Sequence, residues 1–133
     1  MRYQVTDWND AYANGTHIPG AQDFVDRWPV QAAAFRASHP PLGLGRGHLW
    51  QPQGEARGLV VFIHGGYWMK FSPGDWSHLA AGPLAAGWAV AMPAYTLAPA
   101  ARLSDMTMQV AQAITDAAAL VGGPIALTGH SAG

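Results

Sequence analysis

Two short segments of this 133-residue chain hold the residues best suited to chemistry. The first, residues 129–133, reads GHSAG and fits the pattern GxSxG. Small flanking residues are required where a backbone turns tightly with strained dihedral angles, and such a turn lifts a serine hydroxyl clear of its surroundings. Ser131 is therefore a candidate nucleophile for acyl transfer. The backbone N–H of Ala132 is a candidate donor to the oxyanion that forms in that reaction.

The second segment, residues 64–68, reads HGGYW. Gly65 and Gly66 let a backbone come close to a reacting group because no side chain stands in the way, so this segment is a candidate source of the second oxyanion donor. Tyr67 and Trp68 are large aromatic residues beside the glycine pair. Substrate contact and simple packing explain these two side chains equally well.

Apolar runs must position both segments. LVVFI (59–63) precedes HGGYW, IALT (125–128) precedes GHSAG, and WAVAM (88–92) lies between them. Apolar runs without polar alternation are typical of parallel strands that are covered on both faces. Because the carboxyl ends of parallel strands meet at one edge of a sheet, we expect both segments at the edge where open α/β folds bind ligands.

Two helical stretches separate the three runs. Residues 75–86 predict a helix, although Gly82 and Pro83 weaken it. Ser104 or Asp105 can cap a second helix, which Gly122, Gly123 and Pro124 end. The resulting order of elements predicts two βαβ units, a parallel sheet and the fold class α/β. The apolar residues of the second helix recur at intervals of three and four: Met106, Val110, Ala113, Ile114, Ala117, Leu120 and Val121.

The N-terminal region, residues 1–47, reads as helix and loop. Phe24, Trp28 and Ala32 are four residues apart, which predicts a helix over 20–38 that Pro29 kinks or splits. The Pro- and Gly-rich residues 39–47 predict a loop, and a short strand could begin in 48–51. Since no repeat or low-complexity linker interrupts the chain, we expect one domain over 1–133, with the strands and helices of the sheet in 48–133.

Composition excludes several classes of partner. Seven basic and eight acidic residues give a net charge of −1 without runs of one sign, so neither nucleic acid nor a membrane surface is expected as a partner. The absence of cysteine removes disulfides and thiolate chemistry. The first ten residues have acidic side chains and no apolar core, which argues against a secretory signal and favours the cytoplasm. Charged residues make up only 11%, against roughly 25% in typical domains, which indicates that much of the surface is covered.

The histidines offer no obvious base for Ser131. His130 is its neighbour in an extended segment, and adjacent side chains there point to opposite sides. His64 is better suited to stabilising the glycine loop, and His78 to a structural role. No pair of histidines has ligand spacing, so neither a metal nor a cofactor is expected.

Longer patterns carry a family resemblance. HGG followed by GxSxG is shared by many esterases and lipases of the α/β-hydrolase superfamily. HGGYW, the residues DWSHL at 75–79, YTLAP at 95–99 and RLSDMTMQV at 102–110 together resemble the kynurenine formamidase (arylformamidase) branch. The resemblance covers most of the chain and about the first half of the family's length.

This resemblance implies an α/β-hydrolase fold that reaches as far as its nucleophile elbow, the tight turn that carries the serine. The implied reaction is hydrolysis of the formyl amide of N-formylkynurenine through an acyl-enzyme on Ser131. The family's Asp and its His base follow the elbow and have no counterpart in this sequence. Without a base a serine hydroxyl is a weak nucleophile, so the chain alone is expected to be inactive.

Other interpretations remain open. A carboxylesterase for small esters would use the same HGG and GHSAG segments, and a non-catalytic remnant or interaction module would use neither. The expected small-molecule partner is an aryl formamide or a small ester. An apolar strand over 125–128 at the sheet edge also predicts self-association, or pairing with a complementary C-terminal half.

Overall fold

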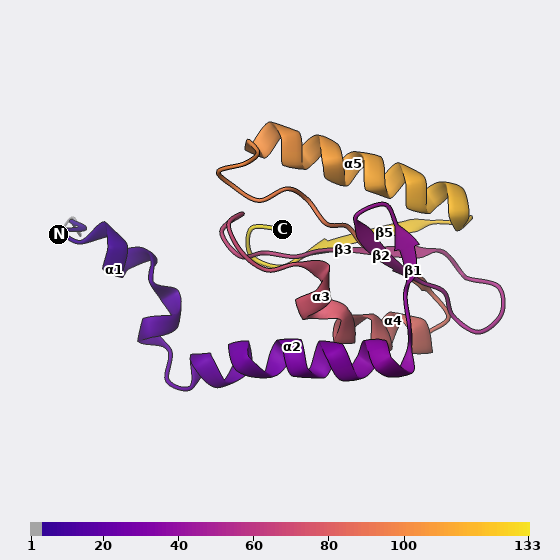
Figure 1. Cartoon of the computed structure of the whole chain (residues 1–133), viewed down its shortest axis with the longest axis horizontal. Coiled ribbons are helices and arrows are strands. Elements are labelled where there is room, and N and C mark those ends of the chain that lie inside the picture. The colour runs from indigo at the N-terminus through magenta and orange to yellow at the C-terminus, as the bar shows by residue number, and fades with distance from the viewer. Residues whose placement is uncertain (1–3) are drawn as a thin grey trace.

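The structure is a computed structural model that describes residues 4–133, so the first three residues of the predicted N-terminal region lie outside the described part. Helices and strands alternate along most of the chain (Figure 1). The elements are α1 Trp8–Tyr12, η1 Asn14–His17, α2 Ala21–Ser38, β1 Leu42–Leu44, β2 Gly47–Trp50, β3 Leu59–Ile63, α3 Pro73–Trp76, η2 Ser77–Ala80, α4 Ala81–Ala85, β4 Ala89–Met92, α5 Leu103–Leu120 and β5 Ile125–Gly129.

A mixed five-stranded sheet forms the centre, in the order β1-β2-β4-β3-β5. The strands β4, β3 and β5 are parallel, which confirms the three strands predicted from apolar runs. β1 and β2 are antiparallel, so the sheet is mixed and not wholly parallel. Ile63 pairs with Gly129, and this register brings the ends of β3 and β5 side by side.

The β1–β2 hairpin corrects the loop predicted for residues 39–47. Leu44 pairs with Gly47 across a two-residue turn. Gly45 has a φ of 52° at the first position of that turn, where hairpins of this length often need a glycine. The loop prediction was wrong for residues 42–44, because β1 is short and the glycines in and around it resemble loop residues. The strand predicted to begin near His48 is confirmed as β2.

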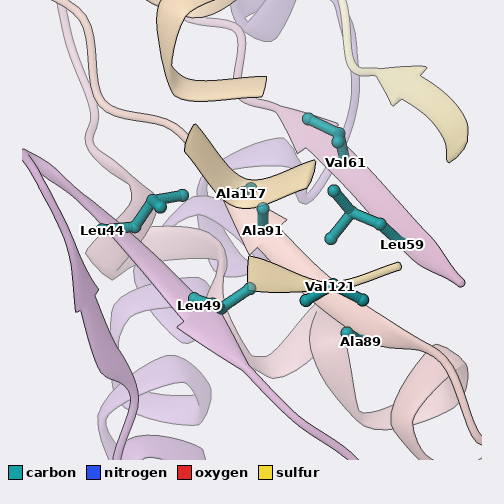
Figure 2. Close-up of a cluster of buried hydrophobic side chains, with 8 residues drawn as sticks. All are labelled: Leu44, Leu49, Leu59, Val61, Ala89, Ala91, Ala117 and Val121. Atoms are coloured by element: carbon teal, nitrogen blue, oxygen red, sulfur yellow. The ribbon is translucent and has the colours of Figure 1, made fainter. Parts of the chain in front are cut away.

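Helices cover both faces of the sheet. α5 lies on one face, while α2, α3, η2 and α4 lie on the other (Figure 1). Successive residues of a strand point to opposite faces, so Leu59 and Val61 of β3 face α5 while Phe62 faces α2. Figure 2 shows the cluster on the α5 side: Leu44, Leu49, Leu59, Val61, Ala89, Ala91, Ala117 and Val121.

The opposite cluster is aromatic and fastens α2. Trp28 of α2 packs on Trp76 of α3 with ring centroids 4.5 Å apart. The guanidinium of Arg36 donates to the Ser77 hydroxyl at 3.0 Å and to the Gly74 carbonyl. Phe24 stays 55% exposed, so the predicted apolar stripe of this helix begins at Trp28 and not at Phe24.

Two details of the predicted helices were wrong, and of the two effects predicted for Pro29, a kink or a split, the split is excluded. α2 is not split at Pro29, which lies on its exposed side, where water can satisfy the carbonyl that proline leaves without a donor. The stretch 75–86 is three short segments, α3, η2 and α4, and not one helix. α5 begins at Leu103 with Arg102 as its N-cap residue. Asp105 acts from inside the helix, since its carboxylate accepts the Arg102 N–H at 3.0 Å.

The edge strand β5 is exposed along its whole length. Ile125 and Leu127 are 47% and 61% exposed. Leu120, predicted to be in the apolar stripe of α5, is also exposed, whereas Met106, Ala117 and Val121 are buried as predicted. Within residues 4–133, no helix has the length and apolarity needed to cross a membrane.

Candidate active site

The GHSAG segment forms a tight turn directly after β5. The N–H of Gly133 donates to the carbonyl of His130 at 3.0 Å, which closes the turn around Ser131 and Ala132. Ser131 is exposed and has a φ of 57°, a left-handed conformation that costs a non-glycine residue on the order of 1–3 kcal/mol. The strained backbone predicted for the candidate nucleophile is therefore present, at an exposed residue.

Both glycines of GxSxG are required by close packing. A Cβ added at Gly129 would lie 2.6 Å from the carbonyl oxygen of Gly133. A Cβ at Gly133 would lie 2.8 Å from the carbonyl oxygen of His64, the residue directly after β3. Real Cβ atoms do not tolerate such distances, so the turn depends on a glycine at each position.

The HGGYW segment lies against this turn. A Cβ at Gly65 would lie 2.9 Å from the Cβ of Ser131 and 3.2 Å from the backbone nitrogen of Ala132. Gly66 has a φ of 116°, which L side chains rarely adopt, and its carbonyl accepts the N–H groups of Met69 and Lys70. The structure thus brings together Gly65, Ser131 and Ala132, three of the residues that the two sequence segments single out.

The two candidate oxyanion donors are the N–H groups of Gly66 and Ala132. Within residues 4–133, neither donates a hydrogen bond to a protein acceptor. His64 restricts the orientation of the Gly66 N–H, because the Nδ1 of His64 lies 2.9 Å from the Gly65 carbonyl oxygen of the same peptide. In a trans peptide the C=O and the following N–H point in opposite directions, so holding the Gly65 carbonyl also fixes the direction of the Gly66 N–H.

His64 is a buried structural residue. Its side chain is 2% exposed and stacks on Tyr95 with ring centroids 4.5 Å apart and an interplanar angle of 9°. The Tyr95 hydroxyl donates to the His64 carbonyl at 2.7 Å. Since the Gly65 carbonyl can only accept, the Nδ1 of His64 carries the proton. Burial lowers the pKa of His64, although the bond to Gly65 and the charge of Asp75 oppose that shift.

His130, Asp75 and Asp116 contact other protein groups, whereas the buried Nδ1 of His78 has no hydrogen-bond partner in the described part of the chain. The ring of His130 packs 4.9 Å from that of Trp76, so it faces the aromatic cluster of α2 and α3. Burial lowers the pKa of His78, whose Nδ1 is buried. Asp75 accepts the N–H of Ser72 at 2.8 Å, and Asp116 accepts the side-chain amide of Gln112 at 2.8 Å. In the described part of the chain, no group of three or more His, Cys, Asp or Glu side chains could hold a metal ion.

Tyr67 and Trp68 lie on different sides of the loop. Trp68 is 38% exposed and lines an apolar cavity of about 340 Å³ beside Ala132. The Tyr67 hydroxyl donates to the Tyr12 carbonyl at 2.7 Å and accepts the side-chain amide of Asn14 at 3.1 Å. Other residues of the cavity beside Trp68 are Ile63, Tyr95, Leu103, Met106, Thr107, Val110 and Gly133.

Sequence reasoning missed several supporting residues. Tyr95 holds His64, and the only sequence signal for it is the family resemblance of the YTLAP segment that contains it. Trp28 and Trp76 flank His130, with ring centroids 6.4 Å and 4.9 Å from it. Tyr12 and Asn14 reach Tyr67 from a distant segment, and no local pattern in the sequence signals that contact.

Solved structures resemble this chain. No family model matches it, and no curated protein does. A candidate thioesterase from Silicibacter sp. TM1040 is 51% identical with a TM-score of 0.87, over 93% of this chain and 51% of that one. An esterase from Pyrobaculum calidifontis is 21% identical with a TM-score of 0.57, over 83% of this chain and 43% of that one. A hormone-sensitive lipase from a metagenome library is 18% identical with a TM-score of 0.56, over 83% of this chain and 47% of that one.

The chain spans about half the length of these structures. The esterase and the lipase share its sheet and covering helices at low identity, which is evidence for the fold alone. The turn at Ser131 and the glycine loop beside it lie at the carboxyl ends of two adjacent parallel strands, as the sequence predicts. This chain has the α/β-hydrolase fold, over about half of its usual length.

Proposed function

We propose that Ser131 is the nucleophile of a serine hydrolase, with the N–H groups of Ala132 and of the Gly65–Gly66 segment as its oxyanion hole. The close approach of Gly65 to Ser131 and Ala132 carries this proposal. Two backbone segments that converge on one serine can place donors where the charge develops in acyl transfer.

The proposed reaction forms an acyl-enzyme. The Ser131 oxygen attacks the substrate carbonyl while a base takes its proton, and the tetrahedral intermediate then expels the amine or alcohol, which receives that proton from the base. Water then hydrolyses the acyl-enzyme, which releases the acid and restores the Ser131 hydroxyl. Neither His64 nor His130 is placed to be that base, because His64 binds Gly65 and His130 packs on Trp76. In this proposal residues outside the present sequence supply the base and the acid, and this chain supplies the nucleophile and the oxyanion donors.

For the substrate we propose an aryl formamide of the N-formylkynurenine type. The cavity beside Ala132 is apolar and includes two aromatic side chains, Trp68 and Tyr95. Flat apolar walls suit an aryl ring.

A small ester or thioester is the second candidate substrate. Structures of the same fold are described as esterases, and the protein that is 51% identical is described as a candidate thioesterase. The same nucleophile and oxyanion donors would serve a formamide, an ester or a thioester, so only the walls of the cavity select among these substrates.

The test uses a chimera in which this chain replaces the matching half of the Silicibacter protein. Turnover is compared for N-formylkynurenine, a short p-nitrophenyl ester and a short acyl thioester, with Ser131→Ala as the control. The proposal predicts that kcat/KM is highest for the formamide and that Ser131→Ala removes turnover of all three. A folded chimera that prefers the ester or the thioester would leave the serine chemistry in place and overturn the substrate.

We also propose that the exposed edge of β5 is covered in the working protein, by a second copy or by a complementary C-terminal half. Its exposed apolar side chains and unpaired backbone groups support this proposal. The known structures are about twice as long as this chain, so they contain further chain that could provide the cover.

A further inference from the structure

The side chain of Tyr67 joins two distant parts of the chain. Its hydroxyl donates to the Tyr12 carbonyl at 2.7 Å and accepts the Asn14 side-chain amide at 3.1 Å. Tyr12 ends α1 and Asn14 begins η1, whereas Tyr67 follows the glycine pair of the candidate oxyanion loop. One phenol therefore uses both its donor and an acceptor position to hold residues 12–14 on that loop.

The loop around Tyr67 is in a conformation that needs external support. Tyr67 and Trp68 have φ values of 53° and 58°, two consecutive non-glycine residues in the left-handed region. Such residues persist only where surrounding contacts hold them. On one side the Trp68 carbonyl accepts the N–H of Ala98 at 2.8 Å, and on the other the Tyr67 hydroxyl binds the N-terminal segment.

The N-terminal segment has few other attachments. Neither α1 nor η1 has a buried residue, and α1 lies well to the side of the sheet in Figure 1. A cavity of about 510 Å³ lies between the segment, the start of α2 and the loop, and it is lined by Tyr67 and Lys70 among others. Because the apolar packing of this segment is so thin, its position depends strongly on the two hydrogen bonds of Tyr67.

We propose that Tyr67 is a positioning residue, which couples residues 8–17 to the oxyanion loop at residues 64–70. The N-terminal segment then helps to hold the Gly65–Gly66 backbone at the distance that Ser131 requires. The catalytic meaning of this coupling rests on the proposed function, but the coupling itself does not. It assigns to the Tyr67 hydroxyl a role in holding the loop and not in contacting the substrate.

Hydrogen–deuterium exchange on the full chain, followed by mass spectrometry of its peptides, tests the coupling without any substrate. In Tyr67→Phe we expect amide exchange to rise about threefold to tenfold in both segments, 8–17 and 64–70, because a lost hydrogen bond lowers the cost of local opening. Asn14→Ala should raise exchange in the loop as well, although it lies outside the loop. Tyr12→Phe is the matched control, since it removes a phenol hydroxyl from the same segment but keeps the carbonyl that Tyr67 binds.

The double variant Asn14→Ala/Tyr67→Phe should exchange no faster than Tyr67→Phe alone, because both changes break one linkage. The proposal would be overturned if, in either segment, amide exchange in Tyr67→Phe were no faster than in Tyr12→Phe. In the active chimera, Tyr67→Phe should lower kcat and change KM less than about twofold, as expected when oxyanion donors are displaced. A rise in KM at constant kcat would instead make Tyr67 a substrate contact. An inactive chimera would count against the proposed function and leave the exchange result standing.

Discussion

A methyl group on Gly65 would lie 2.9 Å from the Cβ of Ser131, although two helical crossovers separate these residues in the chain. The parallel pairing of β3 with β5 creates this relationship, since Ile63 and Gly129 are partners and each strand then turns into its loop. The candidate nucleophile and the candidate oxyanion loop are therefore fixed by the sheet itself.

Gly65→Ala should damage the site more than the fold. Its methyl group would meet Ser131 Cβ and overlap the His130 carbonyl, so the loop or the turn must shift. Crowding of this kind typically costs about 1–3 kcal/mol of stability. Displacing an oxyanion donor should lower kcat in the chimera by about 100-fold or more.

The matched control is Gly82→Ala in α4, where an added Cβ meets nothing within 4 Å. We expect it to leave kcat unchanged and to stabilise the chain by up to about 1 kcal/mol, since alanine is the better helix former. Urea denaturation and steady-state kinetics measure both effects. Equal kcat values for the two variants would mean that Gly65 does not set the donor geometry.

Ser131→Gly should stabilise the chain while it removes the nucleophile. Relief of the left-handed conformation is worth about 1–2 kcal/mol, which exceeds the roughly 0.4–1 kcal/mol that glycine adds to the entropy of the unfolded chain. Ser131→Ala also lacks the hydroxyl but keeps the strain, so it should show no gain. Thermal unfolding of both variants gives the comparison, and a lower Tm for the glycine variant than for the alanine variant would refute the strain.

Stability should fall as the pH drops below about 6.5. Burial lowers the pKa of His64, so the folded state holds it neutral while the unfolded state takes up a proton near the ordinary value of 6.5. Because the pKa of His64 is lower in the folded state than in the unfolded state, its contribution to the free energy of unfolding is fully present above the unfolded-state pKa. This contribution is lost as the pH falls toward the folded-state pKa. The loss is at most about 1.4 kcal/mol per pH unit for one group.

His64→Asn isolates this contribution, because an asparagine amide can donate to the Gly65 carbonyl from the position of Nδ1 and does not titrate. Urea unfolding at pH 5, 6, 7 and 8 should show a shallower pH dependence in this variant. His17→Asn is the control, since His17 is exposed and its Nε2 lies 3.1 Å from an Asp10 carboxylate oxygen. A pH dependence identical in His64→Asn and the parent chain would contradict the assignment.

We expect the exposed edge strand β5 to drive self-association. Leu127 of β5 and Leu120 of α5 are 61% and 60% exposed, so replacing either with lysine removes a similar apolar surface. If the strand edge drives self-association, Leu127→Lys should shift sedimentation toward monomer and Leu120→Lys should not, because charge on an edge strand opposes pairing. Equal effects of the two would point to general apolar contact and not to the edge.

Local patterns predicted the elements near the site well. Apolar runs identified β3, β4 and β5, and glycine spacing identified the turn at Ser131 and the loop at Gly65, because these features depend on residues close in sequence. They could not reveal β1, a three-residue strand with a glycine at its centre, or the three segments that replace the predicted helix over 75–86.

The sequence could not predict the long-range contacts, for a different reason. The bonds from Tyr67 to Tyr12 and Asn14, and the packing of His130 on Trp76, join residues that no periodicity relates. Tyr67 read alone was either a substrate contact or a packing residue, and only the fold brings the N-terminal segment to its hydroxyl.

Labelling of Ser131 tests the central claim most directly. The folded chimera is treated with a fluorophosphonate, digested, and its peptides are weighed by mass spectrometry. The serine hydrolase proposal predicts one adduct, on the peptide that contains Ser131, and none in Ser131→Ala. An adduct on another residue, or a folded chimera that stays unlabelled while the Silicibacter parent is labelled, would contradict it.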